Sequence, residues 1–437
     1  MTEGLADPLL RATPRLESLY RAWSRSGAGL LITGNVMVDR RVLERPANVA
    51  IDDTDPDTFS AEARTRLRRW AAAATEGGSQ VWMQLSHAGR QSPRYVTWRP
   101  LAPSAVQLDL FGNYGRPREL TEAEILAIIR RFAFAATVAR ETGFGGVEVH
   151  GAHGYLISSF LSPVSNRRSD AWGGSLENRA RLLLETVRAV RAAVGRDFPV
   201  AVKLNSDDFR KGGFSHEESL QVARMLDAEA VDLLEVSGGT YEQPRLLGLG
   251  GSVETEVPMR ESTRQREGYF LAYAEGIRAV VRMPLMVTGG FRTRGGMEAA
   301  LAANACDAIG VARPLCTHPR AVAELLQAGT QLPSLERLLV LSPTGKLSPT
   351  SPILLARIAN LLGAQSWYYR QIYRLADGRP ASEPRFLLAS LAMYFRDEWL
   401  AAARMHLARR RRARAGRMRS VATAPAYPRY PAPAPPP

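Results

Sequence analysis

Two histidines and a tyrosine, His150, His153 and Tyr155, stand close together in the segment His-Gly-Ala-His-Gly-Tyr. The preceding residues 146–150 are mostly apolar and predict a buried parallel strand, so the three side chains follow its carboxyl end. Two neutral imidazoles can bind one substrate oxygen, and a phenol with a pKa of about 10 can donate a proton at neutral pH. His87 lies in a second motif of this kind. The pattern favours a catalytic site.

The histidine pair has two other interpretations. Two histidines three residues apart are common in metal sites, but no third ligand stands at a suggestive spacing, which disfavours a metal. A purely structural role is also possible, although two buried imidazoles so close together are costly to satisfy with hydrogen bonds. Catalysis is therefore the leading interpretation of the pair.

Apolar strands and amphipathic helices alternate from residue 29 onward, and these elements must position the site. Strands are predicted at 29–33, 80–85, 146–150, 198–204, 231–236, 284–288 and 307–311. Helices are predicted at 13–27, 60–75, 121–142, 176–194, 216–229, 268–282 and 293–304, the third opened by a capping box at Thr121 and Glu124. Strict alternation predicts an α/β protein with a parallel sheet, and the number of strands suggests a barrel.

A closed (β/α)8 TIM barrel needs one more strand before the helix at 13–27. Only twelve residues precede that helix, and few of them are β-formers. The sequence thus predicts a TIM barrel that lacks most of its first strand and carries a helical C-terminal extension. The predicted domains are a barrel over 1–330, an extension over 331–408 with helices at 352–376 and 384–408, and an Arg-rich then Pro-rich disordered tail over 409–437.

Composition excludes several classes of protein. The chain has 437 residues, of which 45% are hydrophobic, enough for one large barrel with an appendage. Its two cysteines, Cys306 and Cys316, are too few for a disulfide framework, a four-thiolate zinc site or a cysteine-held iron–sulfur cluster. No transmembrane helix or signal peptide is predicted, and a reducing cytoplasm is the expected location.

The net charge of +14 arises largely from eight arginines within residues 404–419. The simplest interpretation is a solvated, partly disordered end. A sharper one is weak contact with an anionic surface, such as lipid headgroups or nucleic acid. No specific nucleic-acid partner is predicted, and a small molecule is the expected partner of the barrel.

Two glycine-containing segments, Thr288–Arg292 and Ile309–Pro314, follow the last two predicted strands. In β/α barrels this position commonly forms a phosphate site from backbone N–H groups and helix N-termini. Either segment alone could be a tight turn with a solvated arginine. Together, in consecutive units, they favour a phosphate-bearing ligand.

Gln84 and Lys203 each stand at the end of a predicted strand on the same face. The glutamine can pair with a heterocyclic amide edge, and the lysine can place a positive charge beside a ring that accepts electrons. Taken alone, each has a simpler role. The glutamine could cap a loop, and the lysine could pair with Asp207 or Asp208.

Five motifs together resemble the old yellow enzyme family, the NADH:flavin oxidoreductases built on an FMN-binding barrel. They are Gln84–Arg90, His150–Tyr155, Arg168–Arg179, Thr288–Arg292 and Gly310–Arg313. The resemblance covers about residues 1–320, and the segment with Gly173-Gly174-Ser175 and Glu177-Asn178-Arg179 is especially specific. It implies an FMN-dependent ene-reductase, in which NADH or NADPH gives a hydride to FMN and FMN passes it to an activated alkene.

The resemblance also implies a role for each site residue. His150 and His153 would bind a carbonyl or nitro oxygen, and Tyr155 would deliver the proton. The implied cofactor-binding residues are Thr2, Asn35, Gln84, His150, Lys203, Gly290, Phe291, Ala312 and Arg313. Thr2 stands where some relatives have a cysteine that tunes the flavin, and Asn35 stands where many have a smaller residue.

Two alternative functions remain open at this point. One is a non-catalytic remnant that binds flavin poorly because most of the first strand is missing. The other is an FMN barrel enzyme that acts on amines or nitro compounds. The sequence indicates neither the physiological substrate, nor a choice between NADH and NADPH, nor the oligomeric state.

Overall fold

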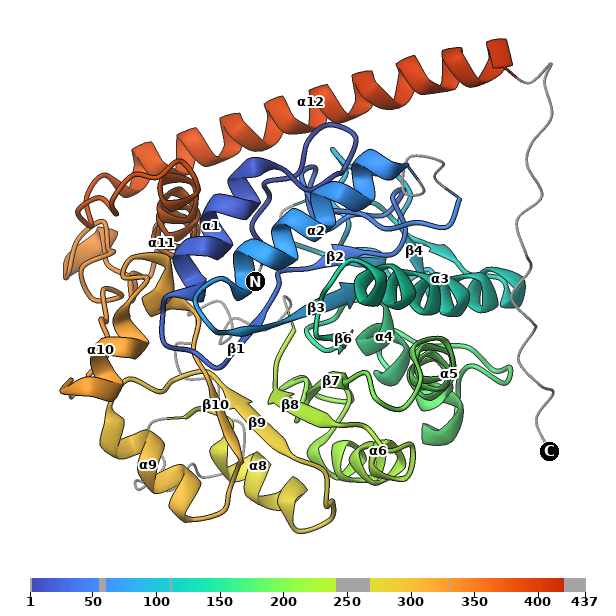
Figure 1. Cartoon of the computed structure of the whole chain (residues 1–437), viewed down its shortest axis with the longest axis horizontal. Coiled ribbons are helices and arrows are strands. Elements are labelled where there is room, and N and C mark those ends of the chain that lie inside the picture. The colour runs from blue at the N-terminus through green and yellow to red at the C-terminus, as the bar shows by residue number, and fades with distance from the viewer. Residues whose placement is uncertain (1, 55–59, 111, 241–267, 330, 420–437) are drawn as a thin grey trace.

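A curled sheet of parallel strands forms the centre of the molecule (Figure 1). The computed structural model describes residues 2–54, 60–110, 112–240, 268–329 and 331–419, the last six of them by backbone alone. The seven strands of the main path, in spatial order, are β1 (Leu30–Ile32), β3 (Gln80–Ser86), β6 (Gly146–Gly151), β7 (Val200–Asn205), β8 (Leu233–Ser237), β9 (Leu285–Thr288) and β10 (Ala308–Gly310). All seven predicted strands are confirmed, and β2 (Val36–Met37) additionally pairs with β3.

Helices follow the strands in the alternation that the sequence predicts. They are α1 (Pro14–Ser24), α2 (Ala61–Thr75), α3 (Glu122–Glu141), α5 (Leu176–Val194), α6 (His216–Ala228), α8 (Leu271–Arg278) and α9 (Arg294–Ala302). The capping box of Thr121 and Glu124 at the start of α3 is confirmed. The short elements α4 (Leu156–Leu161), α10 (Ala321–Gln327), β4 (Leu101–Ala102) and β5 (Arg118–Glu119) were not predicted.

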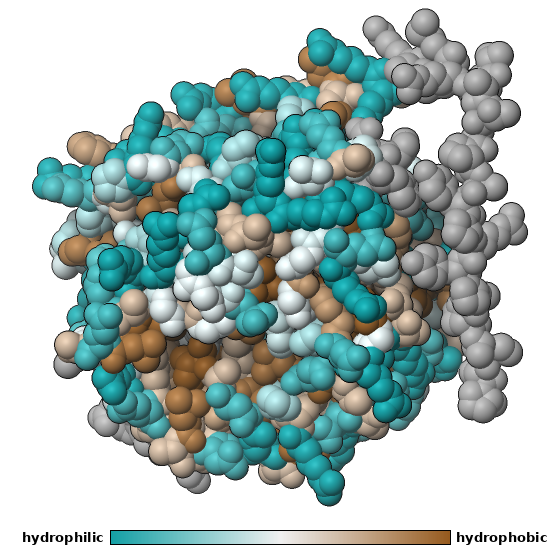
Figure 2. Space-filling view, in the orientation of Figure 1, coloured by the Kyte–Doolittle hydropathy of each residue, from teal (hydrophilic) through white to brown (hydrophobic). Residues whose placement is uncertain are grey.

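The sheet is a TIM barrel that is open on one side, as predicted. Within the described ranges no pairing joins β10 to β1, so these are the two outer strands of the sheet path. An apolar cluster of Ala201, Leu233 and Met286 packs with half-buried side chains from β1, β3 and β10. Figure 2 shows apolar surface over β9 and β10 in this region.

Two long helices form the C-terminal extension, α11 (Leu354–Ala376) and α12 (Leu387–Arg419), and α11 packs against both α1 and α12. The backbone of α12 stays helical to Arg419, beyond the predicted helix end at residue 408 and into the segment predicted as a tail. The predicted proline-rich end falls within residues 420–437, outside the described residues. Among the described helices, none has the length and apolar character needed to cross a membrane.

The extension shares the hydrophobic core of the barrel. Tyr369 and Met405 belong to the same buried cluster as the side chains of α1 and α2. Arg45 and Glu398 form an ion pair in which each side chain is only 3% exposed. The Arg45 guanidinium also lies 4.6 Å from the ring centre of Tyr369 and 5.3 Å from that of Tyr394. These contacts attach the extension firmly to the N-terminal part of the barrel.

Candidate active site

The loop after β6 brings the three predicted catalytic side chains together. The ring centre of His150 lies 5.1 Å from that of His153 and 4.9 Å from that of Tyr155, both edge-to-face. His153 and Gly154 have φ angles of 62° and 80°, which turn the chain sharply after the strand. Tyr155 then stands at the N-cap of α4 and is 3% exposed. The turn thus folds the three rings over the carboxyl end of β6.

Both imidazoles favour the neutral form. Burial lowers the pKa of His150 and of His153 well below the ordinary histidine value, and the nearby charge of Lys203 lowers them further. The Ala152 N–H donates to Nδ1 of His150 at 3.2 Å, which leaves the ring hydrogen of the neutral imidazole on Nε2. Nε2 of His153 lies 2.8 Å from the Ser237 hydroxyl at the end of β8. The pair therefore offers hydrogen bonds without positive charge.

Lys203 lies beside this cluster as one half of a buried ion pair. It is aligned with His150 of β6 on one side and with Glu235 of β8 on the other. Its Nζ donates to Glu235 Oε1 at 2.6 Å, and not to the aspartates at 207 and 208 suggested by the sequence. Burial opposes both charges, but the lysine outweighs it and lowers the pKa of Glu235 to about 2. The carboxylate in turn raises the pKa of Lys203 despite its burial, so both groups are charged at neutral pH.

Gln84 is held by a second buried acid, Glu148. Gln84 Nε2 donates to Glu148 Oε2 at 2.5 Å across the neighbouring strands β3 and β6. Burial, and then repulsion by the Glu235 carboxylate, raises the pKa of Glu148 well above its usual value. Neither Glu148 nor Glu235 was among the predicted site residues. A single glutamate in the middle of an apolar strand, as at 148 and 235, is the signal that could have found them.

Thr2 and Asn35 lie on the other side of Gln84. Asn35 immediately precedes β2, which pairs with β3 at Leu85, the neighbour of Gln84. Asn48 Nδ2 donates to Thr2 Oγ1 at 2.8 Å and to the Asn35 carbonyl at 3.3 Å, so one amide links the two predicted flavin contacts. The Asn35 side-chain amide donates to Glu44 Oε2 at 2.7 Å. The structure thus links Thr2 to Asn35 through Asn48 and places Asn35 at the strand next to Gln84.

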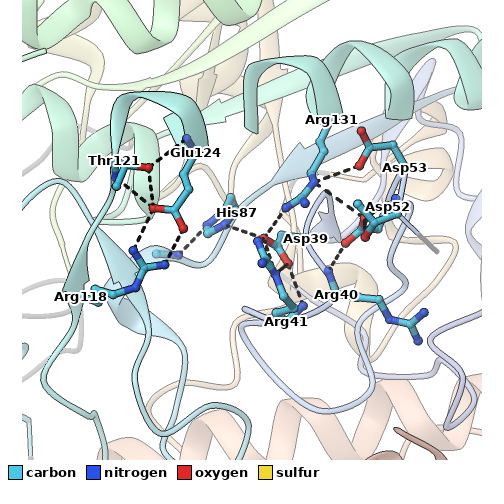
Figure 3. Close-up of polar contacts among 12 residues, drawn as sticks. Asp39, Arg40, Arg41, Asp52, Asp53, His87, Arg118, Thr121, Glu124 and Arg131 are labelled. Atoms are coloured by element: carbon cyan, nitrogen blue, oxygen red, sulfur yellow. Dashed lines mark hydrogen bonds and ion pairs between the residues drawn. The ribbon is translucent and has the colours of Figure 1, made fainter. Parts of the chain in front are cut away.

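His87 does not join the catalytic cluster. Figure 3 shows it in a separate buried network with Asp39, in which Arg131 of α3 donates to Asp39 at 2.6 Å and to Asp53 at 3.0 Å. His87 Nε2 lies 3.8 Å from Asp39 Oδ2. Burial opposes ionisation of Asp39, but the nearby His87 ring, hydrogen bonds from Arg41 and the charge of Arg131 lower its pKa. His87, noted in the sequence as part of a second motif, therefore lies beside the segment after β2.

The segments after β9 and β10 are brought side by side, since Gly310 pairs with Thr288. Gly290 has a φ of 90°, and a Cβ there would lie 3.0 Å from two backbone nitrogens, so only glycine permits this approach. Phe291 is buried behind it. Ala312 and Arg313 begin a short 3-10 helix after β10. The predicted phosphate-binding residues thus form one continuous region.

Arg313 already has an anionic partner in this region. Its Nη1 lies 3.0 Å from Glu336 Oε1, and Arg292 donates to the same oxygen at 2.7 Å. Burial raises the pKa of Glu336, but a hydrogen bond from Ser334 and the two arginines outweigh it and leave the pKa lowered. A carboxylate from residues beyond the barrel therefore contacts the side chain predicted to hold a phosphate.

The residues present fit FMN. Gln84 Oε1 and Asn35 Oδ1 are buried and have no hydrogen-bond partner within the described part of the chain. Buried acceptors of this kind normally bind a donor, and the isoalloxazine edge carries both N–H and carbonyl groups. Arg292 and Arg313, beside the glycine turn after β9, offer guanidinium groups that suit a phosphate. In the described residues, no group of three histidine, cysteine or acidic side chains is placed to hold a metal ion.

The sequence matches a known family over most of its length. The family model described as NADH:flavin oxidoreductase / NADH oxidase family matches residues 6–330. The chain belongs to this family of flavin-dependent NAD(P)H oxidoreductases. The match confirms the predicted enzyme class and the prediction of FMN with a reduced nicotinamide. The roles of the individual site residues remain predictions.

Three similar proteins illustrate the range of the family. A NADH-dependent flavin oxidoreductase, iliE, of Hypocrea jecorina is 36% identical over 337 residues, covering 73% of this chain and 82% of the relative. The NADH-dependent flavin oxidoreductase iliE of a Neonectria species is 38% identical over 321 residues, covering 70% of this chain but only 41% of the relative. The structure of the old yellow enzyme homologue from Zymomonas mobilis aligns with a TM-score of 0.62 and 26% identity, covering 81% of this chain and 94% of that one.

Proposed function

We propose that this chain reduces the carbon–carbon double bond of an alkene conjugated to a carbonyl or nitro group, with NADH or NADPH as the electron source. The cluster of His150, His153 and Tyr155 carries the proposal, because it combines two neutral imidazoles with a phenol whose ring centre lies 4.9 Å from that of His150. Bound FMN supplies hydride transfer between the nicotinamide and the substrate carbon.

The two imidazoles would bind the substrate oxygen. Nε2 of His150 carries a hydrogen, and His153 is positioned by Ser237. As a hydride reaches the β-carbon, negative charge develops on that oxygen, and hydrogen bonds to it strengthen. The lowered pKa values of His150 and His153 keep both imidazoles neutral. A neutral imidazole can donate a hydrogen bond to the substrate oxygen without transferring its proton to it.

Tyr155 would complete the reduction. Its hydroxyl would give a proton to the α-carbon and recover one from solvent, so that one hydride and one proton are added in total. Lys203 would keep a fixed positive charge at the strand ends, because Glu235 compensates for its burial. Gln84 and Asn35 would use their buried acceptors to hold the edge of the isoalloxazine.

Separate measurement of the two half-reactions tests the proposal. The full chain is saturated with FMN and reduced without oxygen by NADH or NADPH, and then mixed with 2-cyclohexenone, a nitroalkene or a primary amine. Rapid reoxidation by the enone with formation of cyclohexanone is expected. Failure to retain FMN would support a non-catalytic protein. Reduction of the bound flavin by the amine, with no reoxidation by either alkene, would support an amine-oxidising enzyme.

We also propose that the protein works in a reducing compartment such as the cytoplasm. Neither Cys306 nor Cys316 is part of a disulfide, and both are buried. Burial raises the pKa of the Cys316 thiol to about 12 and that of Cys306 to about 11, which suppresses the reactive thiolate. Neither thiol is therefore suited to form a disulfide.

A further inference from the structure

The solvent-facing side of α12 combines large apolar residues with arginines and carries no acid. We call this set the outer face of α12. Between positions 388 and 411 its exposed residues are Leu388, Ala389, Ala392, Phe395, Arg396, Trp399, Leu400, Ala403, Arg404, Leu407, Arg410 and Arg411. Trp399 is 62% exposed and Leu388 57%. Leu388, Phe395 and Trp399 are spaced by seven and four residues, so they project from the same side of the helix.

The two acids of α12 are turned toward the protein. Glu398 is buried against Arg45, and Asp397 is half-buried and binds Arg370 of α11 at 3.0 Å. His406 contacts the Tyr95 carbonyl at 2.8 Å, and Arg409 donates to the Arg40 carbonyl. The polar side chains on the inner side of the helix therefore have partners in the barrel and in α11. The outer face remains apolar and positively charged.

An arginine-lined cavity of about 520 Å³ opens beside this face, between α1, α11 and α12. Arg396, Leu400 and Arg404 belong both to the outer face and to the cavity wall. The other arginines of the wall are Arg15, Arg370, Arg374 and Arg379. Asp377 is paired with Arg15 at 2.7 Å, and Asp397 is shared by two arginines. Arginine thus exceeds acid in the wall, which suits a phosphate group.

We propose that the outer face of α12 binds an anionic lipid bilayer, with its apolar side chains at the headgroup boundary and a lipid phosphate in the adjoining cavity. A helix that lies in a membrane surface has this composition, with Trp, Phe and Leu beside arginines. Nucleic acid would use the arginines but not the apolar residues. Charge complementarity therefore favours an anionic leaflet, where each basic residue near the surface contributes to binding.

A second exposed tryptophan lies in the segment that α12 contacts. Trp98 is 74% exposed and stacks with Arg94, whose guanidinium carbon lies 5.5 Å from the ring centre. The same segment includes Tyr95, whose ring centre is 5.8 Å from that of Trp399. Tryptophan with arginine is again the pairing that suits a lipid interface.

The test is vesicle co-sedimentation of the FMN-loaded full chain, which needs no enzyme activity. Vesicles of phosphatidylcholine with phosphatidylglycerol should bind the protein, whereas pure phosphatidylcholine should not. Binding should fall steeply at about 1 M salt, where the screening length is about 3 Å. Phe395→Ser/Trp399→Ser and Arg396→Gln/Arg404→Gln should each weaken binding roughly tenfold or more.

Matched control variants test whether any exposed arginine or leucine, rather than those of the outer face of α12, affects vesicle binding. Arg68→Gln/Arg69→Gln changes two exposed arginines of α2, and Leu326→Ser changes a leucine of α10 that is 60% exposed. Both controls should bind as the unchanged protein does. If the Phe395/Trp399 variant loses its fold by circular dichroism, Leu388→Ser/Leu407→Ser tests the same face at residues without ring contacts.

Three results would overturn the proposal. Equal binding by the face variants and the controls would exclude the outer face as the lipid contact. Light scattering that shows a dimer, dissolved by the apolar substitutions and without vesicle binding, would assign the face to a second copy. Saturable binding of glycerol 1-phosphate that Arg396→Gln/Arg404→Gln abolishes, again without vesicle binding, would assign the cavity to a free phosphate ester.

Discussion

Lys203 donates a 2.6 Å hydrogen bond to Glu235 across two central strands of the sheet. The lysine is 9% exposed and the glutamate 3%. A charge at such a depth is stable only when its partner is present, because desolvation costs several kcal/mol for each ion. Glu148 lies one strand further along and differs, since its raised pKa favours the neutral acid. The two buried glutamates therefore have opposite requirements for charge.

Replacing each glutamate with glutamine should therefore lower the stability of the folded protein by different amounts. Glu235→Gln leaves Lys203 buried without a counter-ion and should lower the free energy of unfolding by about 3–5 kcal/mol at pH 7. Glu148→Gln replaces a group that already favours its neutral form and should cost less than about 1 kcal/mol. Urea denaturation of the apoprotein measures both. Equal losses would show that Glu148 is charged in the folded protein.

The depressed pKa of Glu235 predicts how stability depends on acid. Its pKa is about 2 in the folded protein and 4.5 ordinarily, so the unfolded chain binds the proton first as the pH falls. The stabilisation from this group is complete above pH 4.5 and is lost as the pH falls toward 2. Denaturation between pH 5 and 3 should show this slope reduced in Glu235→Gln. An unchanged slope would mean that Glu235 is not the titrating group.

Tyr155→Phe should separate the two halves of the reaction. The change removes one hydroxyl and almost no volume, so folding, FMN content and flavin reduction by NADH should persist. Alkene turnover should fall about 10²–10⁴-fold, the usual contribution of a general acid. Stopped-flow absorbance follows each half separately. Alkene turnover at the original rate would remove Tyr155 from the mechanism.

His150→Ala should weaken the binding of phenols, whose oxygen resembles the charged oxygen of the proposed transition state. The loss expected for one strong hydrogen bond is about 1.5–3 kcal/mol, measured from the long-wavelength absorbance of the flavin–phenol complex. His216→Ala, a histidine of α6 outside the cluster, serves as the control. Stoichiometric zinc that disappears in His150→Ala would instead support a metal site.

Glu336→Gln should tighten FMN binding. The carboxylate now contacts both Arg292 and Arg313, and a phosphate would compete with it for the same guanidinium groups. Removal of the negative charge should raise FMN affinity roughly fivefold, corresponding to about 1 kcal/mol. Riboflavin has no phosphate, so its affinity should not change. Equal changes for FMN and riboflavin would place the phosphate elsewhere.

The alternation of apolar strands and helices made the fold predictable from the sequence. Parallel strands are buried on both faces, so β6 and β7 are short, mostly apolar runs. Such a run can be identified in the sequence without knowing which strands lie beside it. The turn with His150, His153 and Tyr155 follows one of these strands directly, so its position at the sheet end was also predictable. The family match then supported the cofactor.

The partners of the site residues could not be predicted in the same way. Lys203 has two aspartates nearby in the sequence, yet it pairs with Glu235, 32 residues away in the chain. Glu336 reaches Arg292 from 44 residues away. Such pairings depend on which strand ends and loops meet in space, and no local pattern encodes them.

The ion pair between Arg45 and Glu398 has a consequence for synthesis of the protein. The two residues are 353 positions apart, so Arg45 leaves the ribosome long before its partner exists. At about 5–20 residues per second, the delay is on the order of 18–70 s. During that time the segment after β2 has no counter-ion for its guanidinium and no aromatic rings to cover it. Arg45 therefore lacks its buried ion-pair partner until α12 has been synthesised.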